Sequence, residues 1–228
     1  MSDISENMPV SRTLRWVEFL TLFIATPVLI AVALPPDMMF PALFAATAIG
    51  VALLGLTRGF RWSSLWVGIS RIRWGFVLLT AGLTALVGLA VLWAFRPGAI
   101  FMLLGQGAPV TSNGVPIIVI IALFYPIVSA LPQELVFRPL FFRRYGSILP
   151  SETGAIVLNA ATFSLAHLMY WSWIVALMTF VGGLLFAHSY ERRGSFPEAV
   201  VLHSVTGVVL FAVGMGAYFY SGNVRRPF

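Results

Sequence analysis

Cysteine and lysine are absent from the 228-residue sequence, and only 10% of its residues are charged. The absence of cysteine excludes disulfides, thiolate metal sites, a cysteine nucleophile and palmitoylation of a thiol. A water-soluble domain carries about a quarter charged residues, whereas 59% of these residues are hydrophobic and the mean hydropathy is +0.93. A chain so poor in charge stays solvated only when most of its surface faces lipid. The sequence therefore predicts an integral membrane protein.

Acidic residues are also scarce, since 8 acids stand against 14 basic residues, all of them arginine. A basic excess of this kind can indicate nucleic-acid binding. Here, however, the arginines stand at the ends of apolar runs, mostly in pairs, where anionic lipid headgroups are the nearest partners. We therefore expect membrane lipids, and no nucleic acid, among the partners.

Apolar stretches cover almost the whole chain and approach or exceed the length of about 20 residues that a helix needs to cross a bilayer. Seven such stretches occur, at residues 14–34, 38–56, 75–95, 116–142, 151–169, 171–190 and 196–218. No repeat, low-complexity linker or soluble domain interrupts them. The predicted fold is all-α, a polytopic transmembrane helical bundle of about seven spans that forms one membrane domain over residues 1–228.

The arginines also predict the orientation, because cytoplasmic loops hold an excess of positive charge. With the N-terminus in the cytoplasm, ten arginines fall on the cytoplasmic side, and only Arg96, Arg225 and Arg226 lie outside with the C-terminus. A cleavable signal peptide ending near residues 31–33 is the weaker alternative, because the first apolar run is longer than a signal core and contains Glu18.

The segment 60–74 between the second and third predicted spans has two interpretations. Trp62, Trp66 and Ile69 recur at helical spacing, which favours an amphipathic helix lying flat on the cytoplasmic leaflet. The other interpretation is a connecting loop with scattered aromatic residues.

Ionisable side chains inside the predicted spans are few, and they are the first candidates for function. A charge near the bilayer centre costs about 2.5 to 3.5 kcal/mol on insertion scales, so such groups are kept for a reason. The clear cases are Glu134, Arg138, His167 and His203. Nearer the span ends lie Glu18, His188 and Glu198.

Glu134 and Arg138 are four residues apart, the spacing at which a carboxylate and a guanidinium meet on one helix. Such a pair can serve packing alone. Pro132 and Pro139 bracket the pair and deprive nearby backbone carbonyls of their helical partners. Freed polar groups in a membrane must face protein or water, so the fourth span is expected to be irregular and to line a cavity.

The two membrane histidines lie on separate spans. His167 shares a helical face with Asn159 and Phe163, and His203 has Ser204 beside it. Either histidine taken singly could be a packing residue that is hydrogen-bonded to a carbonyl. Together with Glu134, however, three spans each place one Glu or His in the membrane, which points to a shared site.

Two chemistries fit one glutamate and two histidines. In the first, the carboxylate activates a water molecule for peptide hydrolysis and the imidazoles hold the water and the oxyanion. In the second, the three side chains bind a zinc ion. The residue spacing does not separate them, since no HExxH pattern is present. A serine nucleophile has little support, because no GxSxG pattern occurs.

Three segments, in this order along the chain, resemble the motifs of the CPBP family of intramembrane glutamic-type endopeptidases (CAAX proteases and bacteriocin-processing enzymes, also called Abi). They are residues 133–138, 163–167 and 203–207. The resemblance implies a protease of the bacterial inner membrane, with a core over 116–220 that follows N-terminal spans and an interfacial segment in 1–115. It implies a membrane-associated peptide or protein as substrate and a reaction without a cofactor.

By this resemblance the catalytic residues are Glu134 as base, Arg138 as its partner, His167 holding the water, and His203 at the oxyanion. We expect supporting contacts to the substrate or oxyanion from Gln133, Asn159 and Ser204. The sequence departs from the family pattern twice. Gln133 stands where the family has a first glutamate, and an amide cannot act as a base. Gly207 stands where an asparagine is common.

These departures leave a second hypothesis open, namely an inactive relative that serves as a membrane scaffold or immunity protein and keeps the Glu134 and Arg138 pair for packing. A small transporter is a weaker third hypothesis, since membrane acids and kinked helices also suit ion relays. The sequence lacks the paired broken helices in two halves that such transporters show.

Overall fold

The computed structural model describes residues 11–219, and this part of the chain is nearly all helical, with no β-strand. Six of its helical segments are long and apolar enough to cross a membrane. The predicted all-α transmembrane bundle is therefore confirmed. The protein is an integral membrane protein.

The main helices follow the predicted spans to within a few residues. They are α1 (Arg12–Leu20) continued by α2 (Thr26–Ala33), α3 (Pro36–Gly55), α4 (Trp74–Phe95), α5 (Ile117–Tyr125) continued by α6 (Leu131–Leu135), α7 (Glu152–Ala166), α8 (Trp173–Glu191) and α9 (Phe196–Val213). Three π-helical segments, Thr21–Ala25, Pro126–Ala130 and Val136–Arg144, belong to the first and fourth spans.

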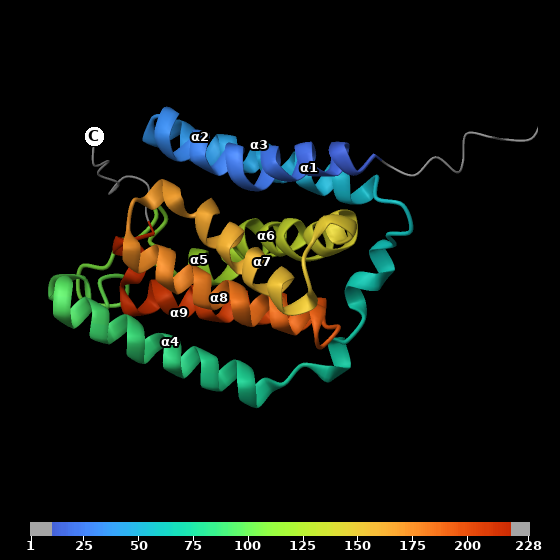
Figure 1. The fold of residues 1–228 in the computed structure, drawn as a ribbon. Helices are drawn as coiled ribbons and strands as arrows, with labels where there is room; N and C mark the ends of the chain where they lie inside the picture. The colour runs from blue at the N-terminus through green and yellow to red at the C-terminus, as the bar shows by residue number, and fades with distance from the viewer. Residues whose placement is uncertain (1–10, 220–228) are drawn as a thin grey trace, which may run out of the picture.

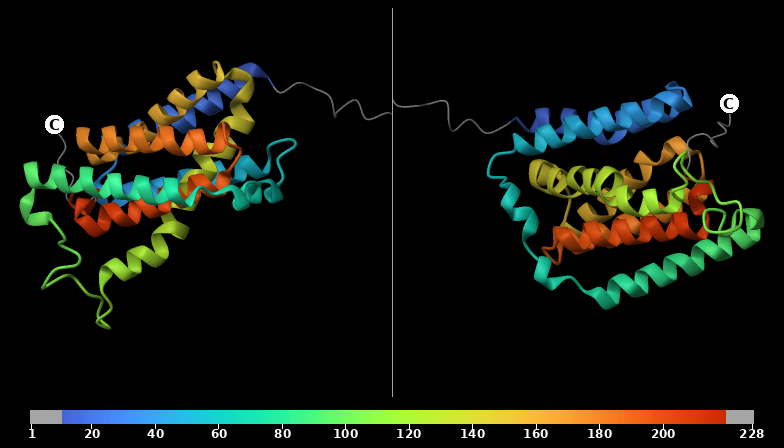
Figure 2. Two further views of the ribbon diagram at one scale, coloured as in Figure 1. Left: turned by 90° about the horizontal axis from the view of Figure 1, so that it is seen from below. Right: turned by 180° about the vertical axis from the view of Figure 1, so that it is seen from behind.

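The helices form three layers (Figure 1). Helices α1 to α3 lie on one side, α4 lies on the opposite side, and α5 to α9 lie between them. The view from behind shows the same arrangement, with α4 running beside α9 (Figure 2). A close approach of α7 and α8 depends on Gly183, where a Cβ atom would lie 2.9 Å from the Cα atom of Ala160. Buried aromatic rings from the first, fourth and fifth spans fill the centre, among them Phe23, Phe137 and Phe163.

The predicted span at residues 151–169 is the one missing from the six. It forms α7, whose 15 residues extend only about 22 Å, less than the roughly 30 Å of the hydrocarbon core. A short 3-10 helix, Leu168–Tyr170, follows it. This turn reaches the end of α2, where the Trp171 ring nitrogen donates a hydrogen bond of 3.2 Å to the Ala31 carbonyl. A helix of this length places His167 inside the molecule.

The interpretation of residues 60–74 as an amphipathic helix is wrong. The segment forms two short 3-10 helices, Trp62–Trp66 and Ile69–Arg71, separated by extended backbone. Gly68 ends the extended part with φ of 86° and accepts a hydrogen bond of 3.1 Å from Ser195 Oγ. The helical spacing of the aromatic residues does not produce a helix here, because Gly68 adopts the left-handed conformation at little cost. The chain also contacts the loop before α9 at this position.

Ion pairs connect the arginine-rich helix ends to one another at one end of the bundle. Arg144 binds Glu18 with a distance of 2.8 Å between Nη2 and Oε1, and Arg192 binds Glu152. The most buried of these groups is Glu198, which accepts hydrogen bonds from the Arg73 backbone and side chain and from Arg193. Glu198 therefore fastens the 60–74 segment to the start of α9.

We expect Glu198→Gln to loosen that segment, because the amide cannot neutralise two arginines that converge on a buried position. Trypsin should then cut after the arginines at 58–73 about tenfold faster than in the wild type, which corresponds to about 1.4 kcal/mol of local opening. Glu152→Gln is the matched control, since its ion pair with Arg192 is exposed and such pairs contribute little. Equal cleavage of both variants would contradict the anchoring role.

Candidate active site

The fourth span is an irregular helix, as its prolines predicted. Two π-helical segments, Pro126–Ala130 and Val136–Arg144, lie on either side of α6, which is only 5 residues long. Pro132 lies in the first turn of α6, and Pro139 lies inside the second π segment. Segments of this kind are frequent at functional sites because they shift side chains around the helix. Here they set the directions of Gln133, Glu134 and Arg138.

Glu134 and Arg138 form a completely buried ion pair, with both side chains 0% exposed. Arg138 Nε donates to Glu134 Oε2 at 2.7 Å, and Nη2 donates to Oε1 at 3.3 Å. Arg138 Nη1 also donates to Asn159 Oδ1 on α7, whose amide group in turn donates to the Phe137 carbonyl at 2.6 Å. Asn159 therefore holds the arginine and lies behind the site.

Aromatic rings close the space around the guanidinium group. The Arg138 Cζ atom lies 5.3 Å from the centre of the Phe163 ring and 5.8 Å from that of Phe186. Rings at this distance attract a cation and exclude water. The environment of the ion pair is therefore apolar, and its charges interact strongly.

His203 on α9 joins this pair. Its Nδ1 atom lies 2.9 Å from Glu134 Oε1, and its ring is stacked on Phe186 at 4.9 Å between centres and 11° between planes. A carboxylate only accepts hydrogen bonds, so Nδ1 carries the proton and Nε2 of the neutral ring is an acceptor. His203 is 5% exposed and lines the cavity described next. The structure thus brings Glu134, Arg138 and His203 together.

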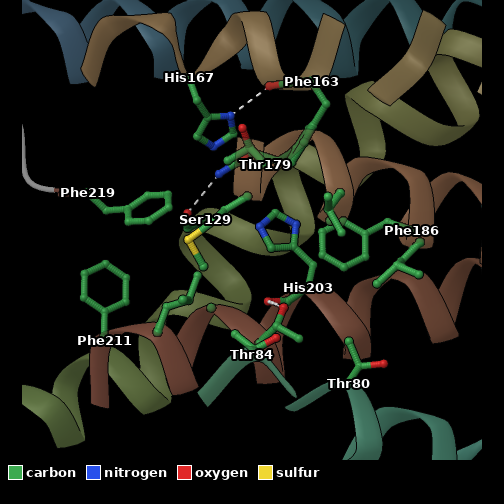
Figure 3. Close-up of a pocket in the computed structure, with 18 of the residues that line it drawn as sticks. Thr80, Thr84, Ser129, Phe163, His167, Thr179, Phe186, His203, Phe211 and Phe219 are labelled. Atoms are coloured by element: carbon green, nitrogen blue, oxygen red, sulfur yellow. Dashed lines mark hydrogen bonds between the residues drawn. The ribbon is translucent and has the colours of Figure 1, made fainter. Parts of the chain in front are cut away.

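A cavity of about 640 Å³ lies between α4 and the helices α5 to α9. Figure 3 shows His167 and His203 projecting into it from different helices, with Phe186 beside His203. Most of its lining is apolar, and the polar side chains include Gln133 and Ser129. Glu134 does not line it. From the cavity, His203 is the accessible member of the Glu134 and His203 pair.

His167 is the second imidazole of the cavity but is not hydrogen-bonded to the first. Its Nδ1 atom lies 2.8 Å from the Phe163 carbonyl oxygen, one turn earlier in α7. The carbonyl accepts, so Nδ1 donates and Nε2 is again the acceptor that remains. The ring stacks on Tyr170 with 6.2 Å between centres. Both histidines can therefore accept a proton or a hydrogen bond within one cavity.

The supporting residues that the sequence predicted lie in different environments. Gln133 lines the cavity, and its Nε2 atom donates to Ser129 Oγ at 3.0 Å. Ser204 is buried without a hydrogen-bond partner and does not line the cavity. Sequence reasoning missed Tyr125 and Ser129, which share the cavity with Gln133. Tyr125, Ser129 and Gln133 follow one another at intervals of four residues, a helical pattern that could have identified the first two.

Among residues 11–219 no group of three or more His, Asp or Glu side chains is placed to hold a metal ion. Both Glu134 oxygens accept hydrogen bonds from Arg138 and His203, so neither oxygen of this carboxylate is free to join the two histidine Nε2 atoms around a metal ion. The predicted set of two histidines and one glutamate thus does not fit a zinc ion in this arrangement.

The cavity opens toward the lipid between α4 and α8. Leu83 and Val181 line it and are nevertheless 53% and 47% exposed on the outer surface, and Leu79 and Leu177 behave in the same way. Side chains that face both the cavity and the exterior mark the rim of an opening. The opening is apolar on both sides, as a passage within a bilayer requires.

Comparison with known proteins adds one match. Residues 115–209 match the family model described as type II CAAX prenyl endopeptidase Rce1-like. The matched region includes α5 to most of α9, with Glu134, Arg138, His167 and His203. No curated protein and no solved structure matches the chain.

Proposed function

The chain carries an Rce1-like domain of the CPBP family at residues 115–209, and from this we propose that it is an intramembrane endopeptidase in which the Glu134 and His203 pair activates water. The observation that carries the proposal is the 2.9 Å hydrogen bond between a wholly buried carboxylate and an imidazole that faces a cavity. A buried acid that orients a histidine is the arrangement by which a histidine becomes an effective general base.

His203, rather than Glu134, takes the proton from water in this proposal. Glu134 has no exposed surface and both of its oxygens already accept hydrogen bonds. Its charge stabilises the imidazolium ion that forms on His203, and Arg138 keeps it ionised and in place. The alternative, expected from the sequence, is that Glu134 itself is the base, and the activity of His203→Ala distinguishes the two.

The reaction proceeds in two proton transfers. The oxygen of a cavity water attacks the carbonyl carbon of the substrate while a water proton moves to His203 Nε2. The carbon–nitrogen bond then breaks, and His203 returns this proton to the leaving amine. His167 Nε2 accepts the second hydrogen bond of the water and orients it, and it takes no proton.

The family description and the apolar cavity together support a substrate with a lipid chain. The matched family is described as a CAAX prenyl endopeptidase, and the opening between α4 and α8 admits an apolar chain from the bilayer. We propose a membrane-associated peptide with such a chain, cut near its C-terminus. The arginine-rich end would face the cytoplasm of a bacterial inner membrane, and Arg225 and Arg226 lie outside the described residues.

The test is cleavage by the purified protein in lipid vesicles. The probes are a quenched-fluorescent peptide with a farnesylated C-terminal CAAX sequence and a quenched-fluorescent library of unmodified membrane peptides. We expect His203→Ala to lower kcat/KM by about 10² to 10⁴, the usual contribution of a general base. His188→Ala is the matched control, because His188 is the remaining histidine of the chain and lies outside the cavity.

Three results would contradict the proposal. Full activity of His203→Ala would show that His203 is not the general base and would favour Glu134 in this role. Loss of wild-type activity with a zinc chelator would indicate a metal site. No cleavage of either probe by the wild type would favour the scaffold hypothesis.

A further inference from the structure

The proposed reaction needs a hydrogen-bond donor that the two histidines do not supply. The Nδ1 protons of His203 and His167 point to Glu134 and to the Phe163 carbonyl, so both Nε2 atoms are acceptors. The tetrahedral intermediate of peptide hydrolysis carries a negative oxygen, and enzymes stabilise it with donors about 2.7 to 3.1 Å away. Another side chain of the cavity that carries a proton donor can supply this contact.

Tyr125 places a hydroxyl-bearing ring next to His203. It is the last residue of α5 and lines the cavity, one turn before Ser129. Its ring meets the His203 ring edge-on at 6.0 Å between centres and the Phe211 ring at 5.7 Å. Contacts from two residues of α9 fix the direction of the ring, so its hydroxyl group is preorganised beside the proposed base.

Gly207 makes room for this hydroxyl group. Gly207 lies one helical turn after His203 on α9, and a Cβ atom added there would overlap Cε1, Cζ and Oη of Tyr125. The hydroxyl end of the ring therefore lies directly against the α9 backbone. Any larger residue at position 207 would push the ring away from this place.

Three threonine hydroxyl groups in the lining of the cavity are already engaged as donors. Thr80, Thr179 and Thr206 each donate to a backbone carbonyl one turn earlier in their own helix, at 2.7 to 2.8 Å. Ser129 accepts the hydrogen bond of Gln133, and Tyr170 lies against His167 rather than His203. Tyr125 is the tyrosine whose ring contacts the proposed base.

We infer that Tyr125 is a catalytic residue whose hydroxyl group donates a hydrogen bond to the oxyanion of the tetrahedral intermediate. The hydroxyl keeps its proton throughout, so the two proton transfers described above are unchanged. The inference rests on the proposed function, because the oxyanion exists only if this cavity hydrolyses an acyl group.

The first experiment compares Tyr125→Phe with Tyr170→Phe in the vesicle assay. Both variants remove one hydroxyl group from the same cavity and keep the ring. Tyr125→Phe should lower kcat by about 10², the effect of losing one oxyanion donor, while KM changes less than about threefold. Tyr170→Phe should leave kcat within about threefold of the wild type. A purely structural role of Tyr125 would not separate kcat from KM in this way.

The second experiment measures binding without turnover. A phosphinic peptide carries a tetrahedral, negatively charged centre, whereas the uncleaved peptide amide is planar. Tyr125→Phe should weaken binding of the phosphinic peptide by about the same factor as kcat and leave binding of the planar peptide unchanged. Gly207→Ala should reproduce this pattern by displacing the ring.

The outcomes distinguish the inference from the proposed function. If the wild type cleaves the probe, His203→Ala does not and Tyr125→Phe retains full kcat, Tyr125 is not the donor although the proposed function holds. If Tyr125→Phe loses kcat and phosphinic-peptide affinity equally, both hold. If the wild type cleaves neither probe, both are overturned.

Discussion

Arg138→Leu should lower the free energy of unfolding by about 3 to 5 kcal/mol, more than any other single substitution proposed for this protein. The guanidinium group is completely buried and holds the Glu134 carboxylate through two hydrogen bonds and Asn159 through a third. Its removal would leave a completely buried carboxylate without its main partner. Unfolding by SDS titration measures the change.

A double variant separates stability from catalysis at this site. The combination of Glu134→Gln and Arg138→Met removes both buried charges, so most of the lost stability should return, to within about 1 to 2 kcal/mol of the wild type. Activity should stay about 10² to 10⁴ lower, since an amide cannot stabilise the imidazolium ion of His203. Arg71→Leu is the matched control, because Arg71 is an exposed arginine.

Two results would contradict this account. A stable, active double variant would show that the ion pair is dispensable for catalysis. A stable Arg138→Leu variant would show that Glu134 finds another partner or is neutral when buried. The first result would favour the interpretation of the pair as a packing feature, and the second would argue against a stabilising role of the pair.

The spans and the site residues were predictable from the sequence to different degrees. Bilayer thickness sets a length that apolar runs must match, so residues 75–95 predicted α4 to within one residue. The same criterion was wrong for α7, because the run 151–169 contains a helix end at Ala166 that hydrophobicity does not mark. The segment 60–74 failed for a similar reason, since Gly68 and a long-range contact to Ser195 decided its conformation.

At the site, the spacing of residues within one helix could be interpreted from the sequence, whereas the contacts between different helices could not be predicted. The four-residue step from Glu134 to Arg138 predicted a pair that the structure contains. The burial of Glu134 behind His203 depends on how α6 meets α9 across 69 residues of sequence. The roles of Asn159 and Tyr125 depend on similar contacts with Arg138 and Gly207. Local periodicity carries no information on such pairs.

A bulky label at the opening between α4 and α8 should strongly inhibit cleavage. The chain contains no cysteine, so one introduced thiol is the only one that a maleimide can label. Leu83→Cys places it on the rim of the opening, and Leu86→Cys places it on the same helix, exposed but outside the cavity lining. Labelling with a bulky, lipid-soluble maleimide should then lower cleavage of the farnesylated probe at least tenfold in the first variant and leave the second unchanged.

The direction of substrate entry follows from this comparison, because both thiols lie in the same apolar environment and differ in whether they face the cavity. A label at position 83 that leaves cleavage unchanged would mean that the substrate does not pass between α4 and α8. Equal inhibition at both positions would indicate a general effect of the label on the bilayer or on α4. Val181→Cys on α8 provides the independent check from the opposite rim, and its labelling should inhibit as strongly as that of Leu83→Cys, because an opening is closed from either side.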